Sequence, residues 1–111
     1  MADQSVTLRE IHSPRDFRTL IARMAADGTL TIEGQDLGDG VEQIFGPGNR
    51  EYEWVLTIQS QHVAQLISAL NSSANVLTAL AERFSNEASA GIEPFLDEQG
   101  IPYEFWNRIG D

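Results

Sequence analysis

The chain of 111 residues contains no cysteine and no lysine, and both absences restrict what it can do. Without cysteine there is no disulfide framework, no thiolate nucleophile and no thiolate zinc site, which fits a cytoplasmic protein held together by packing. The chain has seven basic residues, all of them arginine, and seventeen acidic residues, so its formal net charge is -10. Such a surface repels nucleic acid and anionic membranes and attracts cationic partners.

Long apolar runs and the common catalytic motifs are missing as well. No stretch approaches the ~18 apolar residues of a membrane helix, and the N-terminus lacks a basic segment followed by an apolar run, so we expect neither export nor membrane insertion. His12 and His62 are the only histidines and do not form an HExxH pattern, and neither a nucleotide-binding loop nor a nucleophile elbow occurs. We therefore expect no catalytic residue, metal or cofactor, although missing motifs do not exclude every enzyme.

The residues that are present predict one folded domain over residues 1–111. Apolar residues make up 41% of the chain and arrive in periodic blocks, so the high charge does not indicate disorder. The charge is uneven: residues 1–29 are neutral, and the whole negative excess lies beyond them. A surface formed by the later part of the chain is therefore the natural place for a cationic partner.

The first third of the chain predicts a strand and then a helix. Residues 6–11 alternate weakly, as a short strand does. The segment SPRD at 13–16 resembles a capped helix start, with a serine, a proline at the first position and an acid that can close a capping box. Apolar residues follow at positions 17, 20, 21 and 24, the spacing of a helix that ends near Asp27 and Gly28.

The middle third predicts three strands. Residues 29–33 favour a strand, and the glycine-rich acidic segment 34–40 should be a loop. Residues 41–45 and 51–58 flank the turn segment GPGN at 46–49 and predict a β-hairpin. In the strand at 51–58 the residues alternate between two faces. One face holds Tyr52, Trp54, Leu56 and Ile58, and the other holds Glu51, Glu53, Val55 and Thr57.

The last part predicts helices followed by a strand. Ser60 can cap a helix that the segment 71–73 interrupts, a second helix reaches about Phe84, and a shorter third helix stops at Gly100. The aromatic tail at 103–106 suits a terminal strand. The order β-α-β-β-β-α-α-α-β predicts an α+β fold, with an antiparallel sheet of about four to five strands and helices packed on one face.

Carboxylates are the remaining candidates for a site. Glu33, Asp36, Asp39 and Glu42 recur every three residues, but the spacing fails the pattern of an EF-hand calcium loop, which leaves a solvated loop or a protein-binding surface. The pair formed by Glu51 and Glu53 suits a polar strand face, or acid and base chemistry if a cleft raised one pKa.

Three segments carry a resemblance to a known class of protein: TIEGQDLG at 31–38, EYEWVLTI at 51–58 and GIPYEFWNRIGD at 100–111. With them, most of residues 29–111 resembles immunity proteins of contact-dependent growth inhibition systems, small proteins encoded beside polymorphic toxins. The resemblance implies a cytoplasmic inhibitor that binds one cognate toxin domain, often a nuclease, at the C-terminus of a large secreted toxin. It assigns no contact residue to this chain.

Physical reasoning supplies the contact residues that the resemblance does not. Nuclease toxins need basic surfaces, so we expect carboxylates to meet toxin arginines and lysines and to occlude the active site. The expected toxin-binding residues are Glu33, Asp36, Asp39, Glu42, Glu51 and Glu53. When free, the protein should be a monomer or a weak dimer. The alternative is a small enzyme or ligand-binding domain with a pocket between sheet and helices, in which aromatic neighbours raise the pKa of Glu104.

Overall fold

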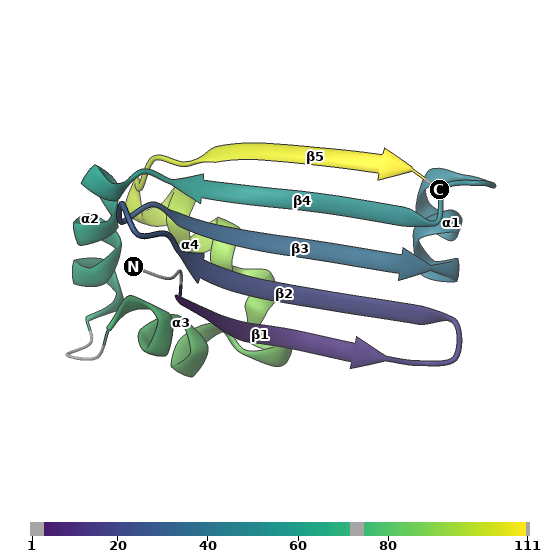
Figure 1. Cartoon of the computed structure of the whole chain (residues 1–111), viewed down its shortest axis with the longest axis horizontal. Helices are drawn as coiled ribbons and strands as arrows, with labels where there is room; N and C mark the ends of the chain where they lie inside the picture. Colours follow the sequence, from purple (N-terminus) through teal and green to yellow (C-terminus); the bar gives the residue numbers. More distant parts are fainter. Residues whose placement is uncertain (1–3, 72–74, 111) are drawn as a thin grey trace.

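Five antiparallel strands form one sheet in which each strand lies beside the next one in the chain (Figure 1). The structure is a computed structural model and describes residues 4–71 and 75–110. In order across the sheet, the strands are β1 (Gln4–His12), β2 (Asp16–Met24), β3 (Leu30–Gly38), β4 (Glu51–Ile58) and β5 (Glu104–Gly110).

The helices occur at two places along the chain. The short helix α1 (Asp39–Phe45) connects β3 to β4, and a helical segment connects β4 to β5. That segment consists of α2 (Ser60–Leu70), α3 (Val76–Phe84), the 3-10 helix η1 (Asn86–Gly91) and α4 (Ile92–Gln99). Figure 1 shows α2, α3 and α4 gathered at one end of the sheet and α1 at the other. The predicted α+β class with an antiparallel sheet is confirmed.

The predicted helix over residues 14–27 is wrong, because this segment forms β2 and the turns on either side of it. The Ser13 hydroxyl oxygen accepts a hydrogen bond from the Asp16 amide at 3.0 Å, but the bond closes the β1–β2 turn and caps no helix. Serine, proline and aspartate favour turns as well as caps. The apparent helical spacing arises because β2 has apolar residues on both faces, with Leu20 buried on one face and Ile21 half-buried on the other.

The predictions for residues 34–49 are also wrong. Residues 34–38 continue β3 where a loop was expected, and residues 41–45 belong to α1 where a strand was expected. The segment 46–49 joins α1 to β4, so there is no hairpin here; Gly46 ends the helix at φ 100°. Only Val41 of α1 is buried, and a single buried position in a short segment gives neither a helical nor a strand period.

The later elements follow the sequence predictions more closely. Helix α3 ends at Phe84, α4 ends at Gln99 and is followed by Gly100 in the left-handed conformation, and the tail forms β5. Ser60 does not cap α2, because Gln59 occupies the cap position and no side-chain cap bond is present. The predicted break after α2 lies mostly at residues 72–74, outside the described residues, and Asn71 closes the helix in the left-handed conformation.

One face of the sheet carries the core. The strand residues Leu20, Ile32 and Leu56 are fully buried, and they belong to the same cluster as buried residues of α2, α3 and α4. Val41 of α1 lies on this face as well, beside Arg18 and Asp36 of the strands. The described helices therefore all lie on one side, as predicted. The opposite face is open.

Candidate functional site

The open face of the sheet brings together three of the predicted toxin-binding residues. Strand alternation places Glu33 on the face opposite to Ile32, and Glu51 and Glu53 on the face opposite to Leu56. In the β3–β4 register Glu33 pairs with Val55, and Gln35 pairs with Glu53. We call the surface formed by Glu33, Gln35, Glu51 and Glu53 the open acidic face.

A shallow pocket of about 240 Å³ lies within the open acidic face. Glu33 and Glu53 belong to its lining, and the side chains of Ile21 and Val55 give it apolar walls. The Gln35 amide donates a hydrogen bond to Glu51 at 3.0 Å and so holds that carboxylate at the rim. An apolar wall beside carboxylates suits the long stem and the charged head of an arginine or lysine side chain.

Two arginines of the chain neutralise part of the open acidic face. Arg23 lies 3.2 Å from Glu33, and Arg108 of β5 bridges Glu51 at 2.8 Å and Glu53 at 3.1 Å. Both arginine side chains are substantially exposed, so these ion pairs are of the surface kind, which contributes about 0 to 1 kcal/mol each. A cation from a partner can therefore compete for these carboxylates at little cost.

The pKa of Glu53 reflects the bridge with Arg108. The hydrogen bond from Arg108 lowers the pKa of Glu53 below its ordinary value. Glu53 therefore stays ionised at neutral pH. It can act as a charged acceptor for a partner's cation, which is the state that an electrostatic interface requires.

Asp36 lies on the other face of the sheet, although it is only three residues from Glu33. It faces α1 and forms an ion pair with Arg9 at 3.6 Å. The Asp36 Oδ1 and Arg9 Nε atoms are buried and make no hydrogen bond. Burial raises the pKa of Asp36 above its ordinary value, and the charges of Arg18 and Arg9 oppose this shift only in part.

The raised pKa of Asp36 predicts a specific pH dependence. A group whose pKa is higher in the folded state favours folding most at pH values below its unfolded pKa, and this contribution disappears as the pH rises through the folded pKa. The stability of Asp36→Asn relative to the natural chain should therefore increase as the pH is raised from about 3 toward neutrality. Urea unfolding at a series of pH values measures this difference.

Asp27 provides a control with the opposite sign. The hydrogen bond that its carboxylate accepts from the Thr29 amide lowers its pKa. The stability of Asp27→Asn relative to the natural chain should therefore fall as the pH is raised through the same window. If both variants changed in the same direction, the assignment of a desolvated carboxylate to Asp36 would be wrong.

Asp39 and Glu42 occupy a third location, on α1. Arg50 binds both carboxylates, Asp39 at 2.9 Å and Glu42 at 3.5 Å, and Arg15 lies 3.8 Å from Asp39. This cluster therefore contains two acidic side chains, Asp39 and Glu42, and two basic ones, Arg15 and Arg50, and it has no excess charge. The structure therefore divides the six predicted contact residues among three places, and their contact with a toxin stays a prediction.

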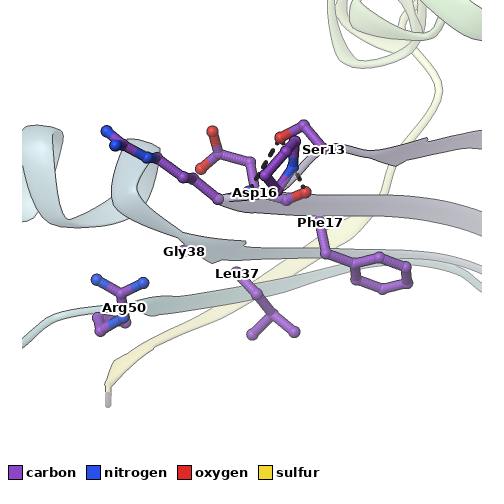
Figure 2. Close-up of a pocket in the computed structure, with 8 residues that line it drawn as sticks. Ser13, Asp16, Phe17, Leu37, Gly38 and Arg50 are labelled. Carbon is purple, nitrogen blue, oxygen red and sulfur yellow. Dashed lines mark hydrogen bonds between the residues drawn. The ribbon is translucent and has the colours of Figure 1, made fainter.

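Another pocket, of about 390 Å³, lies at the end of the sheet near the β1–β2 turn. Figure 2 shows the hydrogen bonds between Ser13 and Asp16 on one side of it and the Arg50 guanidinium on the other. Arg50 and Arg15 could attract an anion, but both already bind Asp39. Both guanidinium groups are therefore already paired with a carboxylate of this chain.

Glu104 lacks the environment that the alternative hypothesis expects. It is exposed and accepts a hydrogen bond from Gln59 at 2.9 Å, and the pocket beside it measures about 170 Å³. Phe105 and Trp106 are also exposed and do not enclose it. Tyr103 points its hydroxyl at Asp97, 2.7 Å away, and this hydrogen bond raises the pKa of the phenol. The structure thus provides no aromatic wall around Glu104.

Three residues in or next to the open acidic face were not foreseen from the sequence. Arg108 and Gln35 are bound to its carboxylates, and Ile21 was expected to point into the core from a helix. The tail strand was predicted, but its neighbour in the sheet was not. Once β5 is known to pair with β4, the register places Arg108 opposite Glu53.

In comparisons with protein families, curated proteins and solved structures, no match is found. Within residues 4–71 and 75–110, no helix combines the length and the apolar character needed to cross a membrane. The same residues contain no group of three or more histidine, aspartate or glutamate side chains placed to hold a metal ion.

Proposed function

We propose that this chain is an immunity protein, which binds a basic toxin domain and neutralises it by covering the surface that the toxin uses on its substrate. The observation that carries the proposal is the open acidic face. It is free of helices, it lies in the acidic part of the chain, and its three glutamates share two exposed arginines. The resemblance to immunity proteins noted for most of residues 29–111 is in line with the same function.

Charge balance distinguishes the open acidic face from the other two locations of predicted contact residues. Around Asp36, the acids Asp36 and Asp16 are matched by Arg9 and Arg18. The α1 cluster is balanced in the same way. The open acidic face alone among the three keeps an excess of carboxylate, and its pocket has room for a side chain. We therefore assign the toxin contact to Glu33, Glu51 and Glu53.

The mechanism would be occlusion without any chemical step. Complementary charge accelerates the encounter and makes it sensitive to salt, and close ion pairs across the interface then slow dissociation. A nuclease would lose access to phosphate because its own cations would be engaged by carboxylates. Toxins with a basic substrate-binding surface are thus the partners that this face fits.

Co-purification provides the test. The full chain is produced untagged together with a tagged protein from the adjacent gene, with the toxin domain inactivated, and the complex is isolated on the tag. We expect a one-to-one complex whose affinity, measured by calorimetry, falls as salt is raised. Absence of a complex with either neighbouring gene product would contradict the immunity function. A complex that is insensitive to salt would contradict the electrostatic mechanism.

A further inference from the structure

The two edges of the sheet differ in how they are protected. At the β1 edge, a bulge between Thr7 and Arg9 interrupts the register, and α3 and η1 pack against the strand. Bulges and covering helices are common protections against unwanted strand pairing. At the other edge, β5 pairs with β4 in an unbroken register from Thr57 and Glu104 to Glu51 and Gly110.

Strand β5 is the unprotected edge. In the described part of the chain no element pairs with its outer side, and Figure 1 shows it as the outermost strand. Its apolar side chains are exposed on both faces: Phe105 is 46% exposed, Trp106 52% and Ile109 43%. An exposed apolar edge strand presents unpaired backbone donors and acceptors to another strand.

We propose that β5 pairs with β5 of a second copy of this chain. The two strands run antiparallel around a two-fold axis through Asn107, and the two sheets join into one sheet of ten strands. In this register the whole of β5 is paired. Asn107 faces Asn107 of the second copy, Phe105 faces its Ile109, and Trp106 faces its Arg108.

The side chains on β5 suit this pairing. Phe105 and Ile109 form an apolar pair on one face, and Trp106 lies opposite an arginine on the other, where a cation over an aromatic ring is favourable. The only charged residues within the strand are Glu104 and Arg108, so it is neutral on a chain whose net charge is -10. No like charges face each other, so the paired strands add no repulsion of their own.

The dimer is expected to respond to salt in the opposite sense to the toxin complex. Two chains of charge -10 repel each other at long range, and salt screens this repulsion. Raising the salt concentration should therefore strengthen the dimer and weaken binding of a basic partner. The dimer does not depend on the proposed immunity function, because its strand pairing uses the outer backbone edge of β5 and not the carboxylates of Glu33, Glu51 and Glu53.

Sedimentation measures the association directly. We expect the natural chain to move from one 12.3 kDa chain toward two as its concentration approaches about 1 mM, where even a millimolar Kd gives a large dimer fraction. Ile109→Lys should remain monomeric, because a lysine on an edge strand opposes pairing. Ile67→Lys, at a similarly exposed position on α2, is the matched control and should still dimerise. A natural chain that stays monomeric, or a dimer that survives Ile109→Lys, would overturn the proposal.

The absence of cysteine permits a test of the register. In an antiparallel pair the two copies of residue 107 have Cα atoms about 4.5 to 5.5 Å apart, a distance that a disulfide can span. Asn107→Cys should therefore form a covalent dimer under mild oxidation. Trp106→Cys would lie opposite position 108 and should cross-link much less. Faster cross-linking at 106 than at 107 would contradict the stated register.

Discussion

Replacing Glu33, Glu51 and Glu53 together by glutamine is expected to weaken binding of the basic partner by at least about thirtyfold. Removing one carboxylate from an ion pair buried at an interface costs about 2 to 5 kcal/mol, and 2 kcal/mol corresponds to about thirtyfold in Kd. Glutamine keeps the size of the side chain, so the pocket between β3 and β4 should be preserved. The loss should appear mainly in the dissociation rate, measured by surface plasmon resonance.

A matched control separates local contact from overall charge. Glu82, Glu87 and Glu98 are exposed on α3, η1 and α4, and their replacement by glutamine reduces the negative charge by the same amount. This control should lower the association rate modestly and leave dissociation nearly unchanged, because its charges act only at long range. Equal losses in the two triple variants would show that net charge, and not the open acidic face, determines binding.

Gly34→Ala is expected to lower the free energy of unfolding by about 1 to 3 kcal/mol, the usual cost of overpacking. A Cβ atom at position 34 would lie 2.2 Å from Cε2 of Trp54, whose indole covers this glycine from the neighbouring strand. The ring would have to move, and Trp54 packs against the core. Urea unfolding gives the size of the loss, and the tryptophan fluorescence of the folded state should change as well.

Gly91→Ala is the control for this substitution. A Cβ atom there would make an ordinary contact of 3.7 Å with Phe84, so its stability should stay within about 1 kcal/mol of the natural chain. In the Gly34→Ala background, Trp54→Phe should restore part of the lost stability, because the smaller ring leaves space for the methyl group. If Gly34→Ala is as stable as Gly91→Ala, the close approach of Trp54 to β3 is incorrect.

Strand β4 shows what the sequence could predict. Its alternation places Leu56 and Ile58 in the core and Glu51 and Glu53 on the opposite face, as the sequence indicates. The prediction for β4 was correct because the strand has a buried face and a polar face, so its apolar and polar residues alternate visibly with a period of two. Strand β2 has no such contrast, and its apolar residues fit a helical period equally well.

The location of the site could be predicted only in part. Glu33 and Asp36 look like neighbours in a regular acidic series, but an odd separation on a strand sends them to opposite faces. The proximity of Glu33 to Glu53 depends on the register between β3 and β4, which pairs Glu33 with Val55 and Gln35 with Glu53. Local patterns contain no information on such a register, so the carboxylates could be identified but not grouped.

The most direct test of the account is the footprint of the partner on this chain, mapped by NMR cross-saturation in the complex. The account predicts that the affected residues lie on the open acidic face, at Glu33, Gln35, Glu51 and Glu53 and at the walls of their pocket. The helical side of the sheet should be unaffected. A footprint centred on α1, or on α2 to α4, would contradict the assignment of the open acidic face as the binding surface.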